Sequence, residues 1–250
     1  MRRVIGVVSG KGGVGKTTFV ANVGLAVTGF DEESIVIDAD LFTSNLGLQL
    51  GLYKSPLGLQ DALEGGISVY DIIHTHHSGL KIIPTSMYPS HLFKKTVTPY
   101  RLKSLLKDIY SLILIDSPPG LGKEVFFVLK ACDEVLVVTN PDIPSVTDAM
   151  RVISAARELK KDPINIVVNR VKDDYELKPE EIEMMCDAPV IGEIPEDKMI
   201  KRSLFEKTPL IHYSPHSPAA VAFKKIAANI LGIDYKPPSL LRLRRIFRKF

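Results

Sequence analysis

The sequence predicts a single α/β domain built on a mostly parallel sheet with helices on both faces. Short apolar runs recur along the 250 residues, and several are continuously apolar, as in parallel strands buried on both sides. Helical stretches separate these runs, which is the pattern of crossover connections. Hydrophobic residues make up 45% of the chain, enough for one sizeable core. The expected strands are residues 4–8, 35–38, 80–83, 112–116, 134–139, 164–169 and 190–194, and the expected helices are residues 17–27, 100–109, 145–159 and 218–231.

The first strand leads directly into a glycine-rich loop and then into a helix. The loop reads SGKGGVGKTT and contains the P-loop pattern G-x-x-x-x-G-K-[ST]. Its glycines let backbone N–H groups cradle phosphate oxygens, and the helix N-terminus adds a partial positive charge. In this pattern Lys16 reaches the phosphates and the Thr17 hydroxyl binds Mg²⁺. The chain is therefore predicted to be a single-domain P-loop NTPase. The expected phosphate cradle is Gly12, Gly13, Val14, Gly15, Lys16, Thr17 and Thr18.

Two further strands are expected to end in carboxylates. Asp38 and Asp40 lie at the end of one, and Asp116 lies at the end of another. Ligands of open parallel sheets bind outside the carboxyl ends of the strands, so these acids are expected to meet the P-loop. An acid at the position of Asp116 can hold Mg²⁺ through water; the alternative is an ordinary turn acid. Asp38 and Asp40, two residues apart, can reach one site.

The P-loop carries a second lysine, Lys11, and the run KGGVGKTT resembles the deviant Walker A motif of the MinD/ParA family of ATPases. The turn DSPPG after the Asp116 strand resembles a second motif of that family. The resemblance implies an ATP-sandwiched homodimer that hydrolyses ATP with Mg²⁺, and in which Lys11 acts across the interface. No arginine finger is identifiable in the sequence, so hydrolysis is expected to be slow without a partner. From the residues alone, Lys11 is equally a solvated loop lysine.

The same resemblance implies further roles. It places Thr17, Asp38 and Asp116 near Mg²⁺, lets Asp40 position the attacking water, and makes Lys11 and Lys16 catalytic. An asparagine side chain offers both a donor and an acceptor to a base, and no guanine motif N-K-x-D is present, so adenine is expected. Residues 41–43 depart from the family pattern, which leaves the behaviour of this loop open. The other nucleotide contacts implied are Asn45, Gly120, Asn169, Arg170, Pro195, Glu196 and Asp197.

Composition excludes several other classes of protein. Two cysteines without a C-x-x-C pair argue against a disulfide framework, a zinc site or an iron–sulfur carrier, and both are expected to be small buried residues. Neither a secretory signal nor a run of about 20 apolar residues is seen, so a cytoplasmic protein is expected. The irregular region 53–90 is expected to form surface loops and short helices. Its histidines, His74, His76 and His77, are expected to be solvated rather than metal-bound.

The net charge of +3 comes from the end of the chain. Five of the last eleven residues are basic and none is acidic, which leaves 27 basic and 29 acidic residues elsewhere. Nucleic-acid binding by the body is therefore not indicated. We expect an ATPase domain over 1–234, a linker over 235–239 and an amphipathic helix over 240–250 that binds an anionic membrane. Its apolar side is Leu240, Leu243, Ile246, Phe247 and Phe250, and its basic side includes Arg244, Arg245 and Arg248. Docking on its own domain and gripping nucleic acid are the alternatives.

Together, the resemblance and the tail predict an ATP-dependent membrane switch. It would be cytoplasmic and peripheral on the inner face of the cell membrane, and it would position or recruit partners, with regulation of the division site as the first interpretation. Placement of flagella or chemosensory arrays and DNA partitioning remain alternatives, and a small-molecule kinase is a more distant one. Asp148 is a candidate contact for an unidentified protein partner, or simply an acid favoured near a helix N-terminus.

Overall fold

The structure is a computed structural model that describes residues 2–41, 44–52, 55, 57–86, 98–109, 111–172 and 176–237. The expected membrane helix, with its apolar residues Leu240, Leu243, Ile246, Phe247 and Phe250 and its arginines Arg244, Arg245 and Arg248, lies outside the described residues. So do Phe42 and Thr43 of the loop that follows Asp40. Among the described residues, none of the helices is long and apolar enough to cross a membrane.

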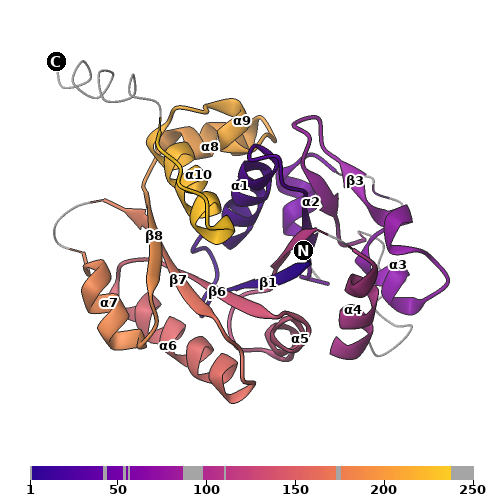
Figure 1. Ribbon diagram of the computed structural model, residues 1–250, viewed down its shortest axis with the longest axis horizontal. Coiled ribbons are helices and arrows are strands. Elements are labelled where there is room, and N and C mark those ends of the chain that lie inside the picture. The colour runs from indigo at the N-terminus through magenta and orange to yellow at the C-terminus, as the bar shows by residue number, and fades with distance from the viewer. Residues whose placement is uncertain are drawn as a thin grey trace.

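The core of the molecule is one eight-stranded sheet in the order β3-β4-β2-β5-β1-β6-β7-β8 (Figure 1). All neighbouring strands are parallel except β3 and β4, which confirms the predicted mostly parallel sheet. The two-residue strand β3 was not predicted, because so short a segment carries no periodicity. The strands are β1 (Arg3–Val8), β2 (Ser34–Asp38), β3 (His74–Thr75), β4 (Lys81–Ile83), β5 (Leu112–Asp116), β6 (Glu134–Thr139), β7 (Ile164–Val171) and β8 (Val190–Pro195).

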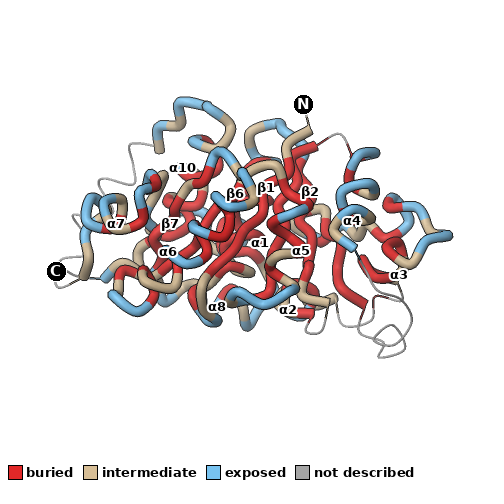
Figure 2. The backbone as a smooth tube through the Cα atoms, turned by 90° about the horizontal axis from the view of Figure 1, so that it is seen from below, coloured by how far each residue is buried: buried red, intermediate tan, exposed pale blue. Residues whose placement is uncertain are grey.

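Helices cover both faces of this sheet, as predicted (Figures 1 and 2). On one face, buried residues of the helices join a core that includes Phe19 and Phe223. On the other face, a second core includes Ile37 and Leu102. The first face carries α1 (Lys16–Thr28), α2 (Asn45–Gln49), α8 (Lys198–Phe205), α9 (Leu210–Tyr213) and α10 (Pro218–Leu231). The second carries α3 (Leu59–Glu64), α4 (Pro99–Leu105), α5 (Lys123–Ala131), α6 (Ile143–Glu158) and α7 (Pro179–Cys186), with the 3₁₀ turns η1 (Val69–Ile72) and η3 (Leu106–Asp108).

The helix expected over residues 100–109 is broken in two. The α-helical part ends at Leu105, and residues Leu106–Asp108 tighten into a 3₁₀ turn. Such turns are frequent at helix C-termini, and the apolar pattern of the sequence does not distinguish them from an α-helix. Cys132 and Cys186 are both buried in the core of the second face, as expected.

The prediction that the histidines of this loop are solvated is wrong for His76, whose side chain is buried. Its Nδ1 accepts a hydrogen bond from the Ser78 backbone N–H at 3.2 Å, and its Nε2 lies 3.1 Å from the carbonyl oxygen of Lys207. A carbonyl can only accept, so the ring is neutral with its proton on Nε2. The ring also lies 3.9 Å, centroid to centroid, from the ring of His77. His76 thus joins the turn between β3 and β4 to the segment between α8 and α9.

The burial of His76 predicts that the thermal stability of the protein decreases at acidic pH. Burial, and then the neighbouring His77, lower the pKa of His76 below its usual 6.5. The unfolded chain therefore binds a proton on this ring more readily, so the contribution of His76 to stability is present above about pH 6.5 and declines as the pH falls below it. We expect His76→Gln, which keeps a donor for Lys207, to reduce the loss of thermal stability between pH 7.5 and 5.5. His216→Gln, at an exposed histidine, is the control and should keep the wild-type loss; an unchanged loss in His76→Gln would contradict the assignment.

Candidate functional site

The P-loop connects β1 to α1 at the carboxyl edge of the sheet, as predicted. Gly13 and Gly15 have φ of 78° and 98°, a left-handed conformation that favours glycine. A side chain at Gly15 is also excluded by a steric clash, because a Cβ there would lie 2.3 Å from Asn169 Nδ2. At Gly10, a Cβ would lie 2.4 Å from the backbone of Asp148 in α6. Glycine is thus required at these positions by backbone conformation and by close approach.

Lys16 lies with three carboxylates behind the loop. Asp38 and Asp116 are register partners on the adjacent strands β2 and β5, and Lys16, Asp38 and Asp116 are all buried. Burial raises the pKa of Asp116 to about 6, although Lys16 and the Thr17 hydroxyl lower it. Burial and the charge of Asp116 raise the pKa of Asp38 well above its usual value. Burial lowers the pKa of Lys16, although Asp116 and then Asp40 raise it.

This cluster fits Mg²⁺ and a polyphosphate. Asp116 Oδ1 is buried without a hydrogen-bond partner, and three acids facing one lysine leave an excess of negative charge in a buried place, which a divalent cation would offset. The described residues contain no group of three or more His, Cys, Asp or Glu that could hold a metal by itself. Mg²⁺ commonly uses one or two protein ligands together with phosphate oxygens. Thr17 and Asp116 are placed to hold it in that way.

The loop after β2 is closed on itself by Asp38. One carboxylate oxygen of Asp38 accepts from the Asp40 backbone N–H at 3.2 Å, and the other accepts from the Leu46 N–H at 3.0 Å. The Asn45 side chain donates to Asp40 Oδ2 at 3.3 Å. The structure therefore brings the predicted residues Asp38, Asp40 and Asn45 together, and it gives Asp38 a clear structural task, which is to hold both ends of this loop.

Asn169 reaches the P-loop because β7 is irregular at its end. The register against β8 shifts between Asn169 and Val171, and Arg170 between them has φ of 62°. Such a bulge re-aims side chains. Asn169 Nδ2 donates to the Val14 carbonyl at 2.6 Å, while its Oδ1 is buried without a partner. The free atom is an acceptor, which suits the amino group of adenine and not the carbonyl of guanine.

The segment 195–197 follows β8 at the same edge. The Glu196 N–H donates to the Val171 carbonyl at 2.9 Å, which fixes this segment beside the bulge. The carboxylate of Asp197 accepts from the Met199 N–H at 2.9 Å and from the Ala219 N–H at 3.3 Å. Asp197 therefore connects the first turns of α8 and α10. Contact of Pro195, Glu196 and Asp197 with a base stays a prediction.

Two further predicted residues, Gly120 and Lys11, lie at the edge of the P-loop region. Gly120 has φ of 86°, and its N–H donates to the Ser9 carbonyl at 3.0 Å, so the DSPPG turn lies against the start of the P-loop. The side chain of Lys11 forms an ion pair with Asp142 at 3.4 Å, and 39% of the lysine side chain is exposed. Lys11 is therefore partly exposed, whereas Lys16 is buried.

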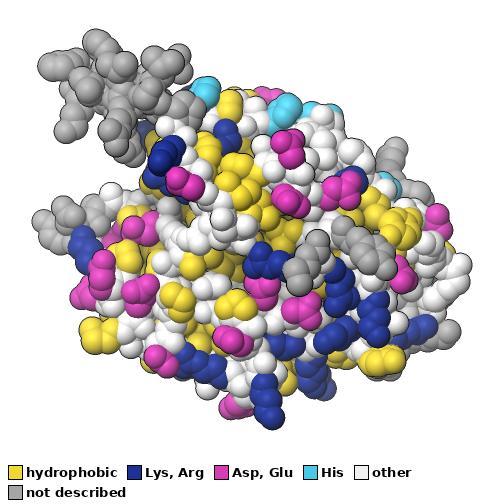
Figure 3. Space-filling model, in the orientation of Figure 1, with side chains coloured by type: hydrophobic (Ala, Val, Ile, Leu, Met, Phe, Trp, Pro, Cys, Tyr) yellow, Lys and Arg dark blue, Asp and Glu magenta, His cyan; other side chains and the backbone are white. Residues whose placement is uncertain are grey.

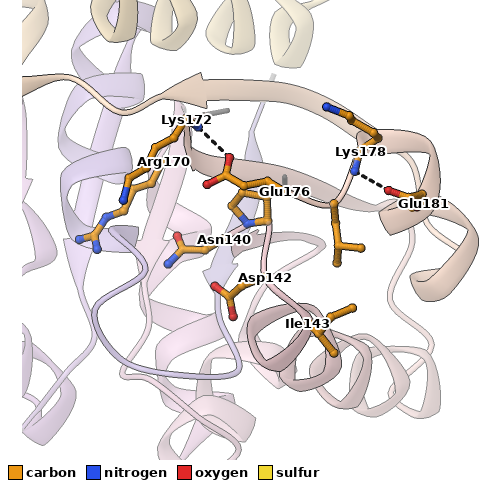
Figure 4. Close-up of a pocket in the computed structure, with 10 residues that line it drawn as sticks. Asn140, Asp142, Ile143, Arg170, Lys172, Glu176, Lys178 and Glu181 are labelled. Atoms are coloured by element: carbon orange, nitrogen blue, oxygen red, sulfur yellow. Dashed lines mark hydrogen bonds between the residues drawn. The ribbon is translucent and has the colours of Figure 1, made fainter. Parts of the chain in front are cut away.

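A hollow of about 760 Å³ opens beside this ion pair, between the ends of β6 and β7 and the start of α6. Figure 4 shows Asn140, Asp142 and Arg170 around it, with Ile143 and Glu181 further along the wall. Asn140 Oδ1 is buried without a partner. The exposed Arg170 and Asp142, which pairs with Lys11, both line this hollow.

The sequence reasoning missed three residues that support the site. Asp142 caps α6 by accepting from the Ser145 N–H at 2.9 Å, besides pairing with Lys11. Gln49 of α2 accepts from the Thr18 hydroxyl at 3.3 Å. Asn22 of α1 accepts from the Ile211 N–H at 3.1 Å. An acid before Ile-Pro-Ser is a recognisable N-cap signal for Asp142; the contacts of Gln49 and Asn22 join distant segments, and no local pattern announces them.

Comparison with known proteins gives consistent matches over almost the whole chain. A protein-family model for ParA, described as an NUBPL iron-transfer P-loop NTPase, matches residues 1–231. An uncharacterised ATP-binding protein of Methanocaldococcus jannaschii is 36% identical, with 100% of this chain and 96% of that protein covered.

Solved structures match as well. The septum site-determining protein MinD of Pyrococcus horikoshii, complexed with Mg-ADP, is 33% identical with a TM-score of 0.84, covering 92% of this chain and 96% of its own. A MinC:MinD cell division protein complex of Aquifex aeolicus matches at 28% identity and a TM-score of 0.82, covering 94% and 98%.

Proposed function

The chain belongs to the ParA/MinD family of P-loop NTPases, and from this premise we propose that it is an ATP-dependent switch that dimerises with ATP and then binds a membrane. The observation that carries the proposal is the pair of lysines. Lys16 is buried among the carboxylates of its own site, whereas Lys11 is held at the surface by Asp142. We propose that Lys16 serves the phosphates of its own nucleotide and that Lys11 serves those of a second subunit.

The nucleotide is proposed to be ATP with Mg²⁺. The unpaired acceptor on Asn169 favours adenine, and the P. horikoshii relative is complexed with Mg-ADP. The backbone of residues 12–15 would cradle the phosphates, Lys16 would neutralise their charge, and Thr17 and Asp116 would hold the metal, which supplies further neutralisation of the phosphate oxygens when bound.

Hydrolysis requires a positioned water. Phosphoryl transfer passes through a loose transition state, so catalysis rests on placement and charge neutralisation. Asp40 is the residue proposed to orient that water, and its carboxylate is held by Asn45. Because Asp38 ties both ends of this loop, movement of the loop would move Asp40. We propose that hydrolysis is slow until a partner fixes this arrangement.

Dimerisation would transfer Lys11 from Asp142 to the phosphates of the partner subunit's nucleotide. The pair is exposed, and exposed ion pairs are worth only about 0–1 kcal/mol, so a triphosphate can compete for the lysine easily. The hollow beside Asp142 is open at the same edge. We propose that this edge faces the second subunit.

Membrane binding is assigned to the tail, residues 240–250, on its sequence alone. The tail is short and basic on one side and apolar on the other, so one copy would bind weakly. Two copies on one dimer gain from effective concentration, which can raise avidity by about 10²–10⁴-fold. ATP would thereby control attachment without touching the tail.

The cargo is proposed to be a protein of the division site, because the matched Aquifex structure is a MinC:MinD complex. We propose that the partner protein contacts α6 near Asp148. The backbone of Asp148 lies against Gly10 of the P-loop, so a shift of α6 on partner binding would also shift the P-loop. Placement of flagella or chemosensory arrays would use the same switch and remains the alternative.

Two other activities receive less support. DNA partitioning would favour a basic body, whereas the residues before the tail carry 27 basic and 29 acidic side chains. Iron transfer, named in the matching family model, needs accessible cysteine ligands. The chain has two cysteines, and both are buried; burial raises the pKa of Cys132 to about 11, which disfavours the thiolate that binds metal.

Deletion of residues 240–250 tests the membrane assignment. We expect the truncated protein to bind ATP normally and to lose co-sedimentation with vesicles of anionic lipid. A full-length Phe247→Glu variant keeps the length of the tail and should behave like the deletion, since it places a charge on the apolar side. The wild type should sediment with ATP and Mg²⁺ and much less with ADP. Equal sedimentation in ATP and ADP would refute the switch, and sedimentation of the truncated protein would refute the role of the tail.

A further inference from the structure

One face of the molecule carries helices without a single acidic residue. These are α1, α2, α8, α9 and α10, all packed on the core that includes Phe19 and Phe223. The segment 198–231, which contains α8 to α10, holds six Lys or Arg residues and one acid, Glu206. By contrast, the helices of the opposite face hold eight acids: Asp61, Glu64, Glu124, Asp148, Glu158, Glu180, Glu181 and Glu183. The helices of the first face thus carry basic residues without acids, whereas the helices of the opposite face carry their eight acids together with six Lys or Arg residues.

An exposed aromatic residue lies in the middle of the basic stretch on α8. Phe205 is 82% exposed, the highest value among the large hydrophobic residues that the structure describes as exposed. At 100° per residue its side chain falls between those of Lys201 and Arg202, and Lys198 lies on the same side about two turns earlier. Ser203 occupies the buried side of the helix. The exposed side of α8 therefore combines an aromatic ring with three cations.

These cations are exposed on the surface of α8. Within the described part of the chain, Lys198, Lys201 and Arg202 form no ion pair. Phe205 belongs to neither of the two hydrophobic cores. A helix face with basic residues around a solvent-exposed aromatic ring is typical of segments that lie at a membrane interface, where the ring enters the headgroup region and the cations meet lipid phosphates.

We propose that this face of α8 is a second lipid contact, in which Phe205 inserts into an anionic bilayer while Lys201 and Arg202 bind its phosphates. The proposal rests on the proposed membrane function and deepens it. Figure 1 shows α8, α9 and α10 together on one side of the sheet, and the chain continues from α10 toward the tail. Lys225, exposed on α10, adds another cation to this layer. The contact would fix the orientation of the body on the membrane, in addition to the attachment proposed for the tail.

A second basic group is visible in Figure 3, at the lower right of the view, where Figure 1 places α4 and α5, with acidic side chains at its border. It belongs to the face whose helices carry the eight acids. Such mixed charge weakens attraction to an anionic surface. Nucleic acid is the other anionic partner that an aromatic ring among cations would suit; we favour lipid because the chain ends in a second segment with the same combination of basic and apolar residues.

The test uses the absence of tryptophan from the chain, so that one introduced tryptophan reports one position. Phe205→Trp is compared with Met184→Trp, because Met184 is 79% exposed on α7 of the acidic face. Both full-length proteins are mixed with ATP, Mg²⁺ and vesicles of either phosphatidylcholine or phosphatidylcholine with phosphatidylglycerol. We expect a blue shift and at least threefold less quenching by acrylamide for Phe205→Trp on the anionic vesicles, and no change for Met184→Trp. Phe205→Ser should weaken vesicle binding about three- to tenfold while leaving ATP hydrolysis unchanged.

The outcomes separate this contact from the membrane function as a whole. If both tryptophan proteins sediment with vesicles and neither fluorescence changes, or if Phe205→Ser binds like the wild type, the α8 contact is refuted and the tail alone is the anchor. If the full-length protein does not sediment at all, both proposals fail. A response of Phe205→Trp to duplex DNA, with none to vesicles, would overturn the lipid contact in favour of nucleic acid.

Discussion

Replacing Asp116 with asparagine is expected to stabilise the nucleotide-free protein and to abolish its Mg²⁺-dependent ATP hydrolysis. The carboxylate is buried, its Oδ1 has no hydrogen-bond partner, and burial raises its pKa from 3.8 to about 6. At about 1.36 kcal/mol per pKa unit, the charged form costs the folded state about 3 kcal/mol at neutral pH. Asparagine removes the charge but leaves a polar group with incomplete partners, so a gain of about 1–3 kcal/mol is expected.

The pH dependence of that gain follows from the direction of the shift. Because the pKa of Asp116 is higher in the folded protein, its cost is present above about pH 6 and disappears below the unfolded value of 3.8. The difference in melting temperature between Asp116→Asn and the wild type should thus shrink from pH 7.5 to pH 4.5. The charge of Asp116 also raises the pKa of Asp38, so the difference reports Asp116 together with its coupling to Asp38.

Two measurements complete this test. Thermal melts with and without Mg-ATP should show a large stabilisation of the wild type and a small one of Asp116→Asn. Asp133→Asn, at an acid placed at the opposite end of β6 from the site, is the control and should leave hydrolysis unchanged. An asparagine variant that is less stable than the wild type at pH 7.5, or that hydrolyses ATP at the wild-type rate, would contradict the role of Asp116.

Replacing Lys11 with alanine is expected to keep ATP binding and to lose both the ATP-dependent dimer and the vesicle binding. Lys11 lies outside the buried cluster, so its loss should change ATP affinity little, and an exposed pair contributes at most about 1 kcal/mol to folding. If attachment needs two tails, loss of the dimer should lower vesicle binding at least tenfold. Analytical ultracentrifugation and co-sedimentation with anionic vesicles, both with ATP and Mg²⁺, measure the two losses.

Asp142→Asn provides the matched control for Lys11. Asparagine is as good an N-cap as aspartate, so α6 keeps its first turn, while the charge that holds Lys11 is removed. We expect this variant to dimerise with ATP at protein concentrations up to about fivefold lower than the wild type, since at most about 1 kcal/mol of competition is removed. Vesicle binding of Lys11→Ala at wild-type strength would disprove the link between dimer and membrane.

The fold was predictable because its signals are local. Each continuously apolar run became a strand, and the P-loop, Asp38, Asp116 and Asn169 all lie at one edge of the sheet as expected. What the sequence did not predict depends on contacts between distant segments. The buried His76 is bonded to Lys207, and Lys11 is paired with Asp142, each pair 131 residues apart. Neither partner is marked by spacing, because tertiary packing alone brings them together.

The predicted residues lie at one edge of the sheet, but their hydrogen bonds were not predicted. Asp38 was expected to act at the metal, yet both of its oxygens accept backbone N–H groups of the following loop. Asn169 was expected to face a base, and one end of its amide is already bonded to the P-loop. A motif names the chemical group that is present at a position; how many of its bonding directions are already occupied depends on the backbone around it.

The close approach of Gly15 and Asn169 has a consequence for how this chain can change over time. Any side chain at position 15 would collide with the amide at position 169, and without that amide the Val14 carbonyl would lose its donor. Neither replacement is harmless alone, and they lie on opposite halves of the chain. A change at either position therefore disturbs the P-loop, and replacing Asn169 would not release position 15, whose φ of 98° still favours glycine.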